Sequence, residues 1–190
     1  MKKKFASYGK CWEYLKESKV YFLIILLVFL ISAVVGFIKP VFLVEFIEKF
    51  VKELIEKTEG MNFFQLLIFI FQNNLITAFI GMIFGLILGV FPLFTSVMNG
   101  YVLGFVSNKV VGVVGVGSLW KLIPHGIFEI PALIISLGLG LKLGMFIFAK
   151  DKKKQVLYDL GNSLRVFLLV ILPLLIIAAI IETGLMFLLG

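Results

Sequence analysis

The segment Pro124-His125-Gly126-Ile127-Phe128-Glu129-Ile130-Pro131-Ala132 is the part of the chain around which we expect the other helices to pack. It holds the only histidine, and Glu129 follows His125 by four residues, so both side chains share one face of a helix. Their surroundings are apolar enough to cross a bilayer, where the most polar side chains cost about 2.5–3.5 kcal/mol on insertion scales. Such groups usually face the interior of a helical bundle.

Pro124 and Pro131 bracket this pair and determine the shape that we predict for its helix. A single helix over residues 119–148 would be about 45 Å long, which exceeds the hydrocarbon thickness of about 30 Å. Pro131 has no N–H, so the carbonyl of Ile127 loses its usual donor. We therefore predict a fourth transmembrane helix that is kinked or broken. Lys142, near its inner end, is expected to reach toward the membrane surface.

The composition places the whole chain in the membrane. Of 190 residues, 61% are hydrophobic, and the mean hydropathy is +1.12. Several long runs carry almost no charge, which is typical of membrane-spanning helices. We predict an all-α polytopic membrane protein with about five transmembrane helices plus amphipathic interfacial helices, in a single membrane domain. The single cysteine, Cys11, excludes an internal disulfide.

The order of apolar and charged runs predicts the following segments. They are a basic interfacial segment (1–19), a first span (20–38), an external amphipathic helix with a short arm (41–72), a second span (73–91), a third span (93–111), the fourth span (119–148), a cytoplasmic loop (150–160) and a fifth span (164–182). The arm over 63–72 has three possible forms: interfacial, re-entrant, or the outer end of the second span. Asp151 and Asp159 fall in the predicted loop.

Small and polar residues recur along the predicted spans. Glycines at four-residue spacing let a neighbouring helix approach closely; we assign this packing role to Gly81, Gly85, Gly89, Gly100, Gly104, Gly140 and Gly144. Asn73, Asn74 and Asn99 are candidates for hydrogen bonds between helices, worth about 0.6–2 kcal/mol each. The simpler alternative to any functional role is that these residues only hold the helices together.

The distribution of lysines predicts the orientation. Six lysines precede Val20, and residues 150–165 carry four more together with Arg165. An excess of basic residues marks cytoplasmic segments. We predict a multi-pass protein of the plasma membrane, with a cytoplasmic N-terminus and an external C-terminus. The basic residues lie beside spans and form no basic face with interleaved aromatics, so we expect no nucleic-acid partner.

Several chemistries are open to His125 and Glu129. The pair can act as a structural polar lock, as a proton relay or substrate contact in a small transporter, or as part of a metal site or hydrolase. One histidine with one nearby acid falls short of three or four metal ligands, and H-E-x-x-H is absent. We therefore expect no metal, no cofactor and no catalytic residue.

The run from Pro124 to Ala132, with the motif H-G-x-x-E-x-P-A and the glycines that follow, resembles the stage II sporulation protein M family of membrane proteins. Asn73-Asn74 and Asn99-Gly100 also resemble that family's pattern, and the likeness covers roughly residues 20–185. The resemblance implies a relationship to proteins that, in spore-forming bacteria, act as a membrane scaffold for peptidoglycan-degrading partners. Many relatives occur in organisms that do not sporulate, so the sporulation role is not transferred to this chain.

The resemblance and the missing catalytic set favour an integral membrane scaffold or assembly protein without catalytic activity. The alternative is a small channel or transporter that uses the His/Glu stripe, and a second alternative is a membrane-embedded hydrolase with His125 as base. The expected partners are the lipid bilayer, a second copy of the chain in a homodimer, and other membrane or envelope proteins.

Overall fold

Every regular element of the described chain is a helix. A computed structural model describes the backbone of residues 2–117 and 123–189, and the side chains of residues 8–117 and 126–188. The elements are α1 (Lys2–Glu17), α2 (Lys19–Ile38), α3 (Val44–Thr58), α4 (Phe63–Ile83), η1 (Phe84–Leu86), α5 (Val90–Val114), α6 (Ile123–Gly144), η3 (Met145–Phe148), α7 (Lys152–Val166), η4 (Phe167–Ile171) and α8 (Leu172–Leu189). The predicted all-α class is confirmed.

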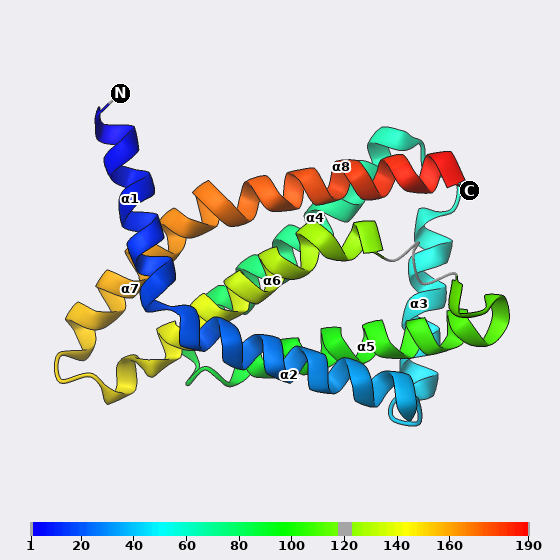
Figure 1. Cartoon of the computed structure of the whole chain (residues 1–190), viewed down its shortest axis with the longest axis horizontal. Helices are drawn as coiled ribbons and strands as arrows, with labels where there is room; N and C mark the ends of the chain where they lie inside the picture. The colour runs from blue at the N-terminus through cyan, green and yellow to red at the C-terminus, as the bar shows by residue number, and fades with distance from the viewer. Residues whose placement is uncertain (1, 118–122, 190) are drawn as a thin grey trace.

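Among the described residues, five helical segments are long and apolar enough to cross a membrane: Lys19–Ile38, Phe63–Leu86, Val90–Val114, Gly126–Phe148 and Lys152–Leu188. They run side by side along the long axis of the molecule, whereas α1 and α3 lie across its two ends (Figure 1). The chain is therefore a five-span, multi-pass membrane protein, as predicted.

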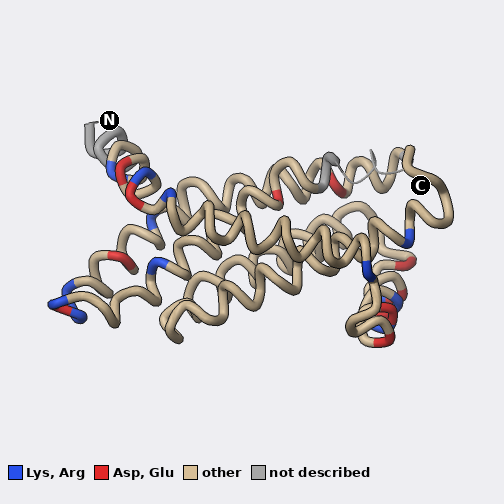
Figure 2. The backbone as a smooth tube through the Cα atoms, turned by 60° about the horizontal axis from the view of Figure 1, so that its bottom comes forward, with Lys and Arg blue, Asp and Glu red and all other residues tan. Residues whose placement is uncertain are grey.

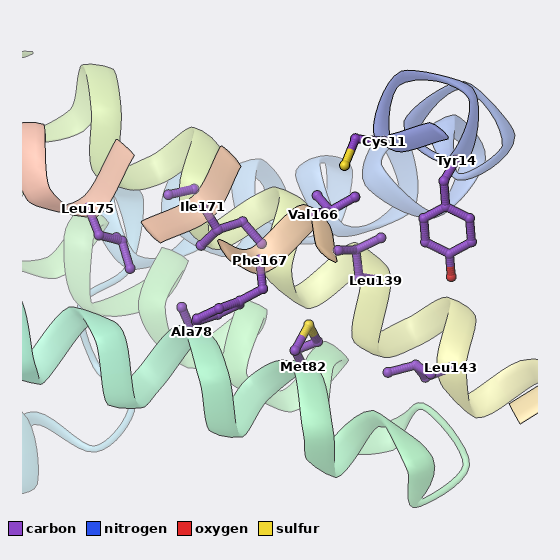
Figure 3. Packing of buried hydrophobic residues seen from close by; sticks show 11 residues of the cluster. Cys11, Tyr14, Ala78, Met82, Leu139, Leu143, Val166, Phe167, Ile171 and Leu175 are labelled. Atoms are coloured by element: carbon purple, nitrogen blue, oxygen red, sulfur yellow. The ribbon is translucent and has the colours of Figure 1, made fainter. Parts of the chain in front are cut away.

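The α6 helix is the centre of the bundle. It contacts α2, α4, α5 and α8. In its most apolar stretch of 18 residues, 61% of the residues are buried, whereas the corresponding stretches of the other four spans are 22% to 33% buried. The sequence placed this helix in the middle of the bundle, and the burial agrees with that prediction. The largest core cluster joins α6 to α1, α4 and the last helices; it includes Cys11, Met82, Leu139 and Phe167 (Figure 3).

The second span begins ten residues earlier than predicted. Asn62 caps α4: its side chain accepts from the Gln65 N–H at 3.0 Å, and the Gln65 side chain accepts from the Asn62 N–H at 2.9 Å. The helix then continues through Asn73 and Asn74 to Ile83. The predicted short arm is therefore the outer end of the second span, which is one of the three forms left open.

The turn between the second and third spans lies before Pro92, not at it. Leu88 and Gly89 have φ values of 55° and 69°, in the left-handed region. Pro92 is buried in the first turn of α5, where its missing N–H removes no intrahelical bond. The proline therefore begins a helix, and the glycine makes the turn.

The fourth span was predicted to be kinked or broken, and within the described residues it is unbroken from Ile123 to Gly144. Pro131 lies inside α6, which continues through it to Gly144. The residues after Gly144 tighten into a short 3-10 helix. Pro131 still removes one backbone donor from the helix, but the neighbouring helices keep the segment helical.

The last span is also longer than predicted. The helix begins at Lys152, inside the segment 150–160 that was predicted as a loop, and continues through η4 into α8. The π-helix at Phe167–Ile171 ends two residues before Pro173, which cannot donate to the carbonyl of Leu169. The wider π turn accommodates this missing donor, so the chain stays helical.

Charged residues gather at the two ends of the molecule, and the middle is almost free of them (Figure 2). We call the end where α1 meets α7 the basic end, because it joins the lysine-rich N-terminal helix to residues 150–154. The other end carries α3. The two lysine-rich segments thus share one end, as the five-span path required.

Candidate functional site

Glu129 links the central helix to α4. Its Oε2 accepts a hydrogen bond of 2.8 Å from the side-chain amide of Asn74, and both residues are half-buried. His125 lies one turn earlier in the same helix, but its side chain lies outside the described residues, as does that of Pro124. The predicted contact between His125 and Glu129 therefore stays a prediction, and Asn74 is the described partner of the acid.

The other two asparagines make no described bond to another helix. Asn73 is exposed, and its backbone carbonyl accepts from the Thr77 hydroxyl at 2.9 Å. The amide of Asn99 donates to the carbonyl of Thr95 at 2.8 Å, within α5. Of the three predicted asparagines, Asn74 alone forms a described interhelical hydrogen bond.

Two buried serines form further links between spans. Ser96 donates to the carbonyl of Ile25 at 3.0 Å, which joins α5 to α2. Ser136 donates to the carbonyl of Ala78 at 2.7 Å, which joins α6 to α4. Ser96 lies four residues before Gly100 and Ser136 four residues before Gly140, so each serine extends a row of the predicted packing glycines.

The glycines of α4, η1 and α6 lie at backbone contacts. A methyl group on Gly85 would overlap the carbonyl oxygen of Gly140, and one on Gly140 would lie 2.6 Å from the carbonyl oxygen of Gly81. A methyl group on Gly144 would overlap the backbone N of Gly89. Gly81, Gly85, Gly140 and Gly144 therefore lie in the contact between the second and fourth spans, and Gly89 extends this contact into the turn before α5.

A second glycine contact joins α2 to α5. A methyl group on Gly100 would overlap the carbonyl oxygen of Phe29, and one on Gly104 that of Ala33. Gly36 faces the carbonyl oxygen of Tyr101 in the same way. Sequence reasoning missed Gly36 because it has no glycine four residues away in its own helix.

The basic end holds a buried charged cluster that the sequence did not reveal. It consists of Tyr14 on α1, Lys142 on α6 and Asp159 on α7, which are 1%, 9% and 2% exposed. Tyr14 Oη donates to Asp159 Oδ1 at 2.9 Å, and Lys142 Nζ lies 3.9 Å from the same oxygen. The ammonium group is 3.8 Å from the centre of the Tyr14 ring. One phenol and one ion pair thus join three helices.

Neighbouring side chains complete the hydrogen bonds of this cluster. Lys142 Nζ donates to Ser18 Oγ at 3.1 Å and lies 3.5 Å from Glu17 Oε2. The second oxygen of Asp159 accepts from Gln155 Nε2 at 2.8 Å. Buried charges are tolerated when they are paired and hydrogen-bonded in this way.

Burial also changes the acidity of two groups on α1. Burial raises the pKa of Tyr14 above its ordinary value, and the Asp159 carboxylate adds to this effect against an opposing hydrogen bond with Ser163. Tyr14 therefore stays protonated at neutral pH and remains a hydrogen-bond donor. Burial also raises the pKa of the Cys11 thiol, which the nearby Arg165 partly offsets.

Lys142 and Asp159 both depart from the sequence prediction. Lys142 was expected to extend to the membrane surface, and Asp159 was placed in a loop; both are buried and oppose each other. The helix that extends to Lys152 carries Asp159 inward. Their common partner Tyr14 lies 145 residues before Asp159, which no local pattern could have revealed.

Comparison with known proteins gives a family but no activity. The family described as stage II sporulation protein M matches residues 21–185. The chain is 38% identical over 120 residues to an uncharacterized protein of Methanocaldococcus jannaschii, a match that covers 60% of this chain and 52% of that relative. The match thus spans about half of the relative's length. No solved structure matches the chain. On its sequence and its five-span helical fold, the chain belongs to the stage II sporulation protein M family.

Proposed function

We propose that this chain is an integral membrane scaffold or assembly protein without catalytic activity of its own. One observation carries the proposal: buried and half-buried polar side chains of the central helix link it to a neighbouring span. Asn74 donates to Glu129, and Ser136 donates to the carbonyl of Ala78. Groups used in this way fix the helices in place, which suits a protein that must present constant surfaces.

The glycine contacts support the same function. Backbone touches backbone at Gly85 and Gly140, and again at Gly104 and Ala33. Interfaces of small residues allow the closest approach of two helices in a membrane. Such close packing suits a rigid platform better than a bundle whose two halves move against each other.

The α3 helix supplies the surface on which we place a partner. Ile47 is fully buried against Tyr101 and Phe105, so α3 is docked on α5. A salt bridge of 2.8 Å between Lys109 and Glu48 crosses the same contact. Phe46 and Phe50 remain 60% and 46% exposed. Aromatic residues on a docked helix suit either the membrane interface or another envelope protein.

Position-specific cross-linking tests the scaffold. A photoreactive phenylalanine analogue replaces Phe46 or Phe50 in native membranes, and Phe64, which is 73% exposed on a span, serves as the lipid-facing control. We expect a discrete adduct from α3, either with a second copy of the chain or with another membrane or envelope protein. Adducts only with lipid would contradict the proposal.

A flux assay separates the scaffold from a transporter. The specific observation that favours transport is the half-buried carboxylate of Glu129 inside a candidate span. The full chain in liposomes is compared with its Glu129→Gln variant for proton, sodium and potassium flux. The scaffold proposal expects flux equal to that of empty vesicles in both. Flux that Glu129→Gln abolishes without lowering the melting temperature would favour a transporter.

We further propose that the N-terminus and the basic end face the cytoplasm of the plasma membrane and the C-terminus faces outward. The lysine excess of the basic end supports this orientation. A Lys57→Cys variant in a Cys11→Ser background is treated with a membrane-impermeant maleimide. Labelling from outside the cell is expected, and labelling from the cytoplasmic side alone would reverse the orientation.

A further inference from the structure

A pocket of about 430 Å³ opens between α1 and α7 at the basic end. Its charged lining consists of Lys10, Glu13 and Glu17 on α1 and Arg165 on α7. The α1 residues lie at helical spacings of three and four, so they share one face. This pocket adjoins the buried Tyr14 cluster, but the scaffold proposed above does not use it.

The pocket lies at the depth of lipid headgroups. The apolar part of the first span begins at Val20, three residues after Glu17, and that of the fifth span begins at Val166, directly after Arg165. Trp12 and Tyr8 on α1 are 62% and 54% exposed. Exposed Trp and Tyr at the start of a span are typical of the membrane–water interface. A ligand in this pocket would therefore share its level with phosphate groups.

The charges of the pocket fit a ligand that carries one positive and one negative charge. Lys10 and Arg165 offer ammonium and guanidinium donors, and Arg165 Nη1 is held by a 2.7 Å hydrogen bond to Asn162 Oδ1. Glu13 is exposed, and the Glu17 carboxylate lies 3.5 Å from Lys142. A simple anion would meet two carboxylates here, and a simple cation would meet two basic groups.

We propose that this pocket binds the headgroup of a zwitterionic phospholipid with a primary ammonium group, the chemistry of phosphatidylethanolamine. Its phosphate lies against Lys10 and Arg165, and its ammonium donates to Glu13 with Glu17 behind it. A primary ammonium has three N–H donors, whereas a trimethylammonium has none. The pocket volume falls within the range of about 300–1,000 Å³ that small-molecule sites usually show.

Gly161 provides a direct test because it lines the pocket and faces open space. A Cβ atom added there meets no atom of the described protein within 4 Å. Gly161→Leu therefore fills the pocket without disturbing the bundle. Gly9→Leu is the matched control, since Gly9 is an exposed helical glycine that also has open space around it and does not line the pocket.

The experiment measures lipid retention by the purified full chain in detergent, using native mass spectrometry. Short-chain phosphatidylethanolamine, phosphatidylcholine and phosphatidylglycerol are added in equal amounts. We expect the ethanolamine lipid to be retained roughly tenfold better than the other two, because its ammonium forms charge-assisted hydrogen bonds that they lack. Gly161→Leu should abolish this preference, and Gly9→Leu should keep it.

A second variant keeps the test independent of the leucine. Glu13→Gln removes one exposed carboxylate, so retention of phosphatidylglycerol should rise and the preference for the ethanolamine lipid should fall. Equal retention of the three lipids by the unmodified chain would overturn the proposal. It would equally be overturned if phosphatidylglycerol bound best, or if both Gly161→Leu and Glu13→Gln, eluting as the unmodified chain does on gel filtration, kept the preference.

Discussion

The hydroxyl group of Tyr14 donates a hydrogen bond of 2.9 Å to the carboxylate of Asp159, which lies 145 residues later in the chain. Through this bond the N-terminal helix is attached to the start of the last span. Both side chains are buried, so the bond is shielded from water. Its energy is therefore measurable by removing one partner.

The first prediction concerns the hydroxyl group itself. Tyr14→Phe leaves the ring over Lys142 but removes the donor to the buried Asp159, so the free energy of unfolding should fall by about 1–3 kcal/mol. Thermal melting in detergent measures the loss. Tyr8→Phe is the control, because Tyr8 is 54% exposed and its change should leave the melting temperature unaltered. Equal melting of both variants would contradict the role given to Tyr14.

The second prediction concerns alkaline pH. Burial raises the pKa of Tyr14 above its ordinary value. As pH rises past about 10, the unfolded chain therefore loses this proton before the folded chain does, and stability falls by about 1 kcal/mol per pH unit. This contribution is complete below pH 9. Tyr14→Phe should flatten the alkaline part of a stability profile measured from pH 8 to 11.

Cys11 contributes to the same profile with the same sign, because burial raises its thiol pKa as well. The profile is therefore measured in a Cys11→Ser background. An alkaline slope that stays unchanged after Tyr14→Phe would assign the effect to another group.

The third prediction is a double-mutant cycle on the buried ion pair. Lys142→Met leaves Asp159 charged and buried without its cation, which should lower the free energy of unfolding by about 3–5 kcal/mol. Adding Asp159→Asn to Lys142→Met should recover much of that loss, because the uncompensated charge is gone. Strictly additive losses in the double variant would show that the two groups do not interact.

The fourth prediction compares glycines in contact with glycines in open space. Gly85→Ala and Gly104→Ala force a methyl group against a carbonyl oxygen of the neighbouring span, so each should separate two helices and lower the melting temperature. Gly161→Ala faces open space on a helix and should raise stability by about 0.5–1 kcal/mol. A neutral result at Gly85 would disprove the backbone contact.

Sequence patterns predicted the class and the number of spans because length and hydropathy are local properties. Helix ends were harder, since they depend on backbone geometry. Asn73 was predicted as the start of the second span, but α4 begins after the capping box of Asn62 and Gln65 and passes through Asn73. Pro131 was expected to kink or break α6, and the helix, which contacts four other spans, is not broken there.

The candidate sites divide in the same way. The glycines were found because their four-residue spacing is visible in one helix, and Asn74 was found as a polar residue in an apolar run. The sequence could not show which of the three asparagines binds Glu129. The cluster of Tyr14, Lys142 and Asp159 was missed because each member looks ordinary in its own segment, and only the folded chain brings the three together.

The helix from Lys152 to Leu188 spans 37 residues, which corresponds to about 56 Å and far exceeds the bilayer core of about 30 Å. The surplus length lies on the side of the basic end, because residues 152–154 are lysines and the apolar part begins at Val166. Tyr14 binds this part of the helix through Asp159. The N-terminal helix is therefore attached to the one span that is long enough to extend past the hydrocarbon core.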